Sequence, residues 1–178
     1  SDLGADISLV TGPTQLADPV RVRVTHIETA QQMLEACETA LPVDIAVCAA
    51  AVGDWRVNEA AKNKLKKDGK TTMPNLELIE NPDILASLSR ADQRPKLVVG
   101  FAAETEQVVE NAIAKRLKKK CDWILANDVS PATGAFGGDE NTLHLITSDG
   151  VEDWPRLGKQ AAADKLAVRI ADRLEKSV

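Results

Sequence analysis

The 178-residue chain has no tyrosine, and two phenylalanines and three tryptophans bring its aromatic content to only 3%. So few rings argue against the stacked aromatic platform on which single-stranded nucleic acids bind. Lysine and arginine number 22 against 27 aspartates and glutamates, which gives a formal net charge of −5. Because binding to a phosphate backbone depends on lysine and arginine contacts, we expect no nucleic-acid partner.

Long apolar runs are also absent: no stretch approaches the roughly 18 residues that a membrane span needs, and no signal peptide opens the chain. The three cysteines are far apart in apolar segments, which indicates reduced core thiols and not a disulfide framework. The two histidines lack metal-binding spacing, so no structural zinc is expected. These absences predict a cytoplasmic protein with no membrane association, and 44% hydrophobic residues are typical of a globular one.

Apolar strand-like segments alternate along the chain with segments of helical period, a pattern that favours an α/β fold. The expected strands are residues 6–11, 20–27, 44–51, 96–103 and 121–127, and a hairpin is expected from 142–147 and 151–155. The expected helices are one capped by Thr29 that ends near Leu41, then 81–90 with Asn81 as cap, 104–120 and 160–174.

This order predicts a Rossmann-like three-layer sandwich, with a mostly parallel sheet and a C-terminal hairpin, in one domain over residues 1–178. A doubly wound domain usually opens with a strand and a glycine-rich turn. Residues 1–6 (SDLGAD) instead resemble the tail of a helix with Gly4 as its C-terminal cap. We therefore expect the domain to be N-terminally incomplete, lacking its first strand and part of its first helix.

Three of the expected strands end in small and polar residues: 49–56 (AAAVGDWR), 100–105 (GFAAET) and 126–129 (ANDV). Ligands of open α/β sheets bind at the carboxyl ends of the strands, where small residues let a ligand approach the backbone. Close packing of helix on sheet explains the alanines equally well. Three such strand ends in one sheet favour a binding site.

Basic residues are concentrated in two short segments, five at 62–70 and five at 115–120. In an acidic protein this distribution favours a small polyanion such as a nucleotide triphosphate. A solvated surface explains either cluster alone, and cations near 120 also complement a helix C-terminus. Lys115 and Lys119 are four residues apart and therefore share one helical face.

The segment Asn81-Pro82-Asp83-Ile84 places a helix N-terminus after an extended stretch, which suits a phosphate or a carboxylate. An ordinary helix cap fits the same residues. Neither GxxxxGK[ST] nor GxGxxG occurs, so a P-loop and a standard dinucleotide fingerprint are excluded. A short-chain oxidoreductase would need a catalytic tyrosine, and the chain has none.

Five segments together resemble the phosphopantothenate–cysteine ligases, and more closely the ligase domain of bifunctional bacterial coenzyme A biosynthesis proteins. The segments are CAAAVGDWR (48–56), KNKLKK (62–67), ENPDIL (80–85), VVGFAAET (98–105) and LANDVS (125–130). They occur in the family's order and cover essentially the whole chain.

The resemblance implies a ligase that joins 4′-phosphopantothenate to L-cysteine through an acyl-cytidylate. It would consume CTP with Mg²⁺ and release pyrophosphate and CMP. It also implies a homodimer, with residues 20–27 or 142–155 able to pair across subunits. A flavin-dependent decarboxylase domain is expected in the same full-length chain, and FMN is not expected in this domain.

The resemblance assigns nucleotide binding to twelve residues and catalysis to one of them, Lys64. The twelve are Ala49, Ala50, Ala51, Asp54, Lys64, Asn81, Pro82, Asp83, Ile84, Phe101, Lys115 and Lys119. Asp54 is also the expected magnesium ligand. The family's Asn-x-Ser-Ser-Gly-type motif, with its catalytic asparagine, does not occur in the chain. A non-catalytic nucleotide-binding domain is therefore the alternative.

Overall fold

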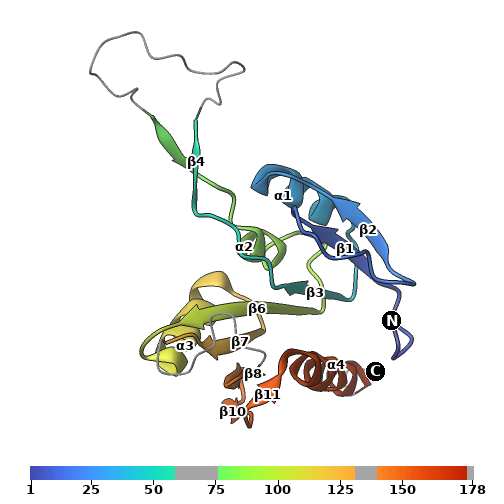
Figure 1. Ribbon diagram of the computed structural model, residues 1–178, viewed down its shortest axis with the longest axis vertical. Coiled ribbons are helices and arrows are strands. Elements are labelled where there is room, and N and C mark those ends of the chain that lie inside the picture. The colour runs from blue at the N-terminus through green and yellow to red at the C-terminus, as the bar shows by residue number, and fades with distance from the viewer. Residues whose placement is uncertain (59–75, 131–139, 176–178) are drawn as a thin grey trace.

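The computed structural model describes residues 1–58, 76–130 and 140–175. Its centre is a five-stranded sheet in the order β10-β9-β7-β6-β3 (Figure 1). The strands β3 (Ile45–Cys48), β6 (Leu97–Glu104) and β7 (Trp123–Asp128) run parallel. The hairpin of β9 (Leu143–Ile146) and β10 (Val151–Asp153) adds the antiparallel edge. The expected α/β fold and C-terminal hairpin are confirmed.

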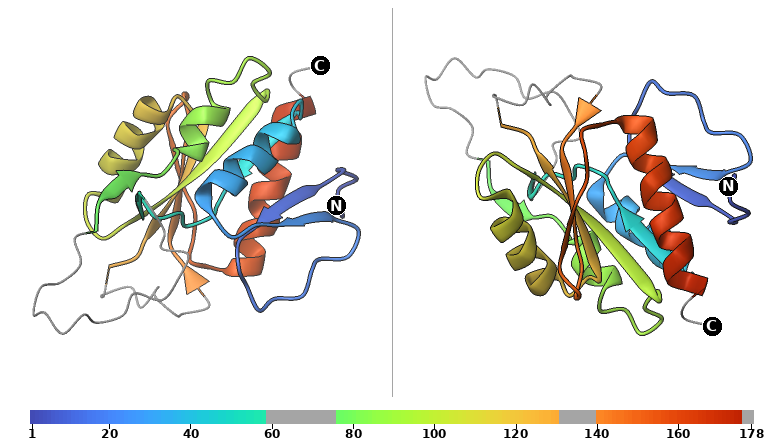
Figure 2. Two further views of the ribbon diagram at one scale, coloured as in Figure 1. Left: turned by 90° about the horizontal axis from the view of Figure 1, so that it is seen from above. Right: turned by 90° about the horizontal axis from the view of Figure 1, so that it is seen from below.

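Helices cover both faces of this sheet, which gives the expected three layers (Figure 2). On one face Ala112 of α3 (Val108–Lys119) packs in a cluster with Val98. On the other face Leu166 of α4 (Lys159–Glu175) packs in a cluster with Val99. Successive strand residues point to opposite faces, so neighbouring valines of β6 anchor the two layers.

The helix α1 (Ala30–Thr39) begins at the expected cap, Thr29. The Thr29 hydroxyl accepts from the Gln32 amide, and the Gln32 side chain accepts from the Thr29 amide, forming a capping box. Met33 of α1 then packs in a third apolar cluster with Ile84 and Leu88 of α2 (Ile84–Leu88). This cluster fixes α1 beside the segment that precedes α2.

The strand β3 differs from the expected strand over 44–51. It has four residues, pairs only with β6 within the described chain, and leaves Val47 47% exposed. The expectation that it is buried on both faces is wrong, because Val47 belongs to none of the apolar clusters among the described residues and stays open to solvent. The strands β1 (Ser8–Thr11) and β2 (Arg23–His26) form a separate parallel pair.

Two helix starts were misplaced by the sequence patterns. The cap of α2 is Asp83 and not Asn81, because the Asp83 side chain accepts from the Ala86 amide while the Asn81 side chain bonds elsewhere. The helix α3 starts at Val108 and not at 104, because Glu104 completes β6 and Gln107 takes a left-handed φ of 46°. Gly4 has a positive φ of 86°, and its amide donates to the Ser1 carbonyl at 2.8 Å, which closes a turn at the start of the given sequence.

The sequence patterns did not predict two short antiparallel pairs. One joins β8 (Glu140–Asn141) to β11 (Leu157–Gly158). The other joins β4 (Trp55–Val57) to β5 (Leu78–Glu80), and this two-stranded ribbon projects from the body of the molecule (Figure 1). No described helix is long and apolar enough to cross a membrane.

Candidate functional site

The candidate site begins where β3 ends. Ala49, Ala50, Ala51 and Asp54 all follow this strand and are all exposed. Pairing of β3 with β6 stops at Cys48 and Gly100, whereas pairing of β6 with β7 continues to Glu104 and Asp128. The carboxyl edge of the sheet therefore has a step beside residues 101–104, lined by small side chains, where a ligand can approach the main chain. Phe101, at the base of this step, packs against the core.

The segment 81–84 is tied to the end of β3 by hydrogen bonds. The Asn81 side-chain nitrogen donates to the Gly53 carbonyl at 2.8 Å, and the Asn81 amide donates to the Asp54 carbonyl at 2.8 Å. These bonds bring two segments that are about 28 residues apart in the sequence into direct contact. The expectation that both segments belong to one site is consistent with this geometry.

Gly100 determines how closely α2 approaches the sheet. A Cβ at this position would lie 2.5 Å from Leu85 Cδ2 and 2.8 Å from Ile124 Cδ1. Because Leu85 fills the space that a side chain would need, α2 and the segment before it pack directly on β6. The glycine of the GFAAET motif therefore has a packing role that helps to place residues 81–84.

Asp83 and Lys119 form an ion pair between the start of α2 and the end of α3. The other carboxylate oxygen of Asp83 accepts from the Ala86 amide at 3.0 Å. Burial opposes ionisation of Asp83, but these two hydrogen bonds and the charges of Lys119 and Arg90 outweigh it and lower the pKa of the carboxyl. Asp83 is therefore ionised at neutral pH.

Asp83 lies close to the end of β3, because its neighbour Ile84 packs in one apolar cluster with Cys48 and Val52. The Asp83 charge also acts on the pKa of the Cys48 thiol. Burial is the main cause that raises this pKa to about 12, and the thiols of Cys37 and Cys121 and the Asp83 charge add to it. All three cysteines are free, as expected, and the raised pKa keeps Cys48 protonated and unreactive. The ion pair of Asp83 and Lys119 thus lies beside the candidate site.

The expected lysines have different surroundings. Lys119 has Asp83 as its partner, whereas Lys115, one helical turn earlier and half-buried, forms no ion pair with any described residue. The expected catalytic residue Lys64 lies outside the described residues, as does the rest of the first basic cluster.

Asp54 is exposed, and its carboxylate forms no ion pair with any residue that the structure describes. Within the described ranges no group of three histidine, cysteine, aspartate or glutamate side chains could hold a metal ion. Mg²⁺ commonly binds one or two carboxylates and completes its coordination with water and substrate phosphates. Asp54 fits that arrangement only together with a phosphorylated ligand.

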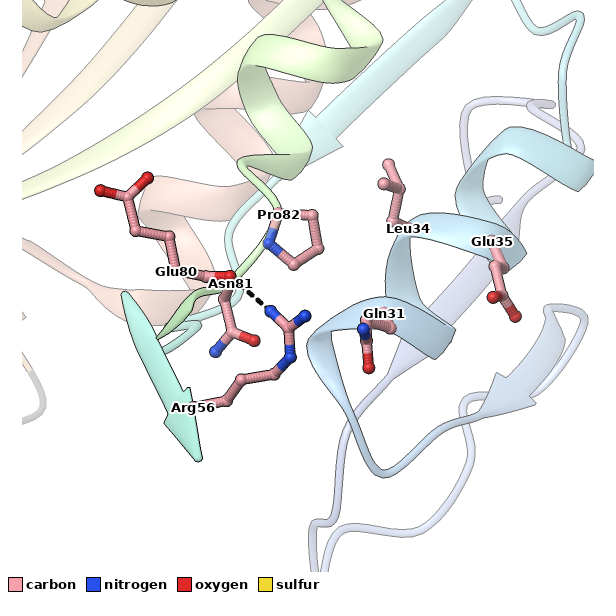
Figure 3. A pocket seen from close by; sticks show the side chains of 7 residues that line it. All are labelled: Gln31, Leu34, Glu35, Arg56, Glu80, Asn81 and Pro82. Atoms are coloured by element: carbon pink, nitrogen blue, oxygen red, sulfur yellow. Dashed lines mark hydrogen bonds between the residues drawn. The ribbon is translucent and has the colours of Figure 1, made fainter. Parts of the chain in front are cut away.

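A pocket of about 350 Å³ lies next to Asn81 and Pro82, between α1 and the ribbon of β4 and β5 (Figure 3). The Arg56 guanidinium, which donates to the Glu80 carbonyl, forms one wall. The complete lining is Gln31, Leu34, Glu35, Arg56, Glu80, Asn81 and Pro82. This pocket was not predicted from the sequence, because the α1 residues that line it belong to no recognisable motif.

Comparison with known proteins agrees with these observations. The model of the family "DNA/pantothenate metabolism flavoprotein C-terminal domain" matches residues 1–174. The bifunctional coenzyme A biosynthesis protein CoaBC of Vibrio cholerae is 35% identical over 98% of this chain, and the match spans 44% of that protein. The chain therefore spans less than half the length of the curated relatives it matches.

Two solved structures extend the comparison to the fold. The C-terminal domain of a CoaBC protein has a TM-score of 0.78 and 33% identity, over 98% of this chain and 79% of that one. A mutant of Cab2 in complex with phosphopantothenate-cysteine is 14% identical over 88% of this chain and 55% of that one. Its TM-score of 0.62 shows a shared fold. The resemblance found in the sequence motifs is confirmed: the chain belongs to the family of DNA/pantothenate metabolism flavoprotein C-terminal domains.

Proposed function

We propose that this chain is the phosphopantothenate–cysteine ligase domain of a bifunctional coenzyme A biosynthesis protein. The observation that carries the proposal is the match, over 98% of the chain, to the solved CoaBC C-terminal domain. The hydrogen-bonded contact between residues 53–54 and Asn81 supports it, because it joins two motifs of the resemblance at one strand end.

The proposed reaction has two steps. A carboxylate is a poor electrophile at neutral pH, so the carboxylate of 4′-phosphopantothenate first attacks the α-phosphate of CTP and displaces pyrophosphate. The amine of L-cysteine then attacks the acyl-cytidylate, forms the amide and releases CMP. Charge builds up on phosphate oxygens during the first step, and cations placed beforehand lower its barrier.

The described residues suit these needs at the step in the sheet edge. Ala49, Ala50 and Ala51 leave room for the nucleotide. Lys115 and Lys119 offer positive charge from α3, and Asp54 would hold Mg²⁺ together with the phosphates of CTP. When bound, Mg²⁺ would neutralise phosphate charge. We assign Lys64, by resemblance, to the stabilisation of charge in the second step.

We also propose that the active form is a homodimer and that the ribbon of β4 and β5 contributes to its interface. Paired residues of the ribbon share a face, and one face consists of Trp55, Val57, Leu78 and Glu80. Its three apolar side chains are 58%, 38% and 55% exposed. A two-stranded ribbon is marginally stable alone, so covering this face with a second copy would stabilise it.

The edges of β2 and β10 remain as alternative pairing sites, in line with the sequence-based expectation of cross-subunit hairpins. Sedimentation of the full-length protein and of its Trp55→Ser and Val151→Ser variants separates these possibilities. We expect the dimer of the Trp55 variant to dissociate at a higher protein concentration than the wild-type dimer. Dissociation of the Val151 variant alone would assign the interface to β10.

The full-length protein would carry a flavin-dependent decarboxylase domain and act in the cytoplasm. The decisive test is pyrophosphate release by that protein with 4′-phosphopantothenate and CTP, with and without L-cysteine. We expect pyrophosphate release that depends on both 4′-phosphopantothenate and CTP. Calorimetric binding of CTP without any release would instead favour a non-catalytic nucleotide-binding domain, and absence of both would contradict the proposal.

A further inference from the structure

Lys119 is the last residue of α3, and its position depends on a single carboxylate. Among the described residues its one ion-pair partner is Asp83, and its side chain is only 22% exposed. The lysine stem has four flexible carbons, so an ammonium group without a partner samples many positions. Here the ion pair holds the ammonium group beside the end of β3.

The backbone of α2 fixes Asp83 in turn. Its carboxylate caps the helix through the Ala86 amide, and Arg90 of the same segment donates to the Lys118 carbonyl at 3.0 Å. Asp83 before α2 and Arg90 after it therefore join this segment to the last turn of α3 at two points. A lysine ammonium has three hydrogen-bond donors. The Asp83 carboxylate accepts a hydrogen bond from one of these donors, so two donors remain for an anion.

We propose that Asp83 is a positioning residue for Lys119: it holds the Lys119 ammonium in place so that the remaining donors meet the phosphates of the nucleotide. The inference rests on the proposed function. It differs from the role that the resemblance implies for Asp83, because the carboxylate serves the ligand through Lys119 and not by direct contact.

The test is a double-mutant cycle in the full-length protein, with the dissociation constant of CTP measured by calorimetry. The variants are Asp83→Asn, Lys119→Met and the double variant. Asparagine caps a helix as well as aspartate does but has no charge to hold an ammonium group. We expect each single variant to weaken CTP binding by about five- to tenfold, as for loss of one charge-assisted hydrogen bond. We expect the double variant to bind like Lys119→Met alone, because Asp83 acts only through Lys119.

A matched control is Lys118→Met, on the same helical turn, which should leave CTP affinity unchanged because Lys118 is exposed and forms no ion pair with any described residue. Asp83→Glu should recover part of the lost affinity. Thermal unfolding separates positioning from folding: Asp83→Asn should unfold only slightly below the wild type, whereas Asp83→Ala should unfold clearly lower because it also removes the cap.

Acylation of Lys119, followed by mass spectrometry without nucleotide, gives an independent measurement. We expect faster acylation in Asp83→Asn than in the wild type. Additive losses in the cycle, tighter CTP binding by Asp83→Asn, or unchanged acylation would each overturn the positioning role while CTP binding by the wild type stands. A wild-type protein that binds no CTP would overturn the proposed function, and this inference with it.

Discussion

Val47 and Val99 are partners in the register of β3 and β6, yet Val99 is 0% exposed and Val47 is 47% exposed. The region of β6, β7 and β9 is covered on both faces by α3 and α4 and contains the two larger apolar clusters. The region of β3 and the ribbon leaves apolar side chains in the open and contains most of the candidate site. Burial stabilises the first region, whereas the second keeps its surface accessible for ligands and partners.

The largest effect expected from this comparison is on turnover. In the full-length protein, Lys64→Gln should reduce product formation by about 100-fold or more, since the role proposed for Lys64 is to stabilise charge on the reacting groups. The free energy of unfolding should change by less than about 0.5 kcal/mol, because that proposed role is catalytic and not structural. Coupled assays and urea unfolding measure the two quantities. Lys70→Gln is the matched control, and equal loss of turnover in both variants would contradict the assignment.

The second prediction compares the two valines directly. Val99→Ala removes fully buried methyl groups and leaves a cavity, so it should lower the free energy of unfolding by about 2–3 kcal/mol. Val47→Ala removes half-exposed groups, and its cost should stay below about 1 kcal/mol. Urea unfolding of the two variants under identical conditions gives both numbers. Similar costs would show that β3 is as well covered as β6.

The third prediction concerns Gly100, which connects the two regions. Gly100→Ala introduces a Cβ that clashes with Leu85, at an expected cost of about 1–3 kcal/mol in the free energy of unfolding. The clash should also shift α2 and residues 81–84, and so raise the KM for CTP. Adding Leu85→Val should recover part of both losses. If the KM for CTP does not change, the packing of α2 on β6 does not determine the geometry of the site, and the prediction is contradicted.

The smallest expected effect is a dependence on pH at Asp83. The pKa of Asp83 is lowered in the folded protein, so the ionised carboxylate stabilises the fold above its ordinary pKa of about 3.8. This contribution is lost as the pH falls through the lower folded value. The Tm difference between wild type and Asp83→Asn should therefore be constant near pH 7 and shrink below pH of about 4. A difference that grows in acid would have the wrong sign.

The sequence predicted the covered region well because burial leaves a clear pattern. The apolar runs around Val98 and Ile124 correspond to β6 and β7, and the expected C-terminal hairpin is formed by β9 and β10. Thr29 was the correct helix cap because its partner Gln32 lies three residues later. Local chemistry and packing agree in these places, so the pattern is sufficient.

Prediction was weaker where distant contacts decide the local structure. Asn81 is as good a cap as Asp83 on local grounds, but Asn81 bonds to Gly53 while Asp83 bonds to Ala86. No pattern around residues 55–57 shows that they pair with residues 78–80. The family resemblance brought together the motifs of the candidate site, but it did not show that Asp83 holds Lys119.

The far end of the ribbon has a consequence for how this protein can vary and be engineered. The Asn58 amide donates to the Glu77 carbonyl at 2.9 Å, and the Asn58 side chain donates to the Glu77 carboxylate at 3.0 Å. Residues 58 and 77 are therefore held side by side where the ribbon ends. The entropy of closing the intervening segment grows only slowly with its length, by about 0.6 kcal/mol for each doubling. The length of the sequence between these two residues can therefore vary at little cost to the register of the ribbon, whereas Lys64 within it has to be retained for the proposed reaction.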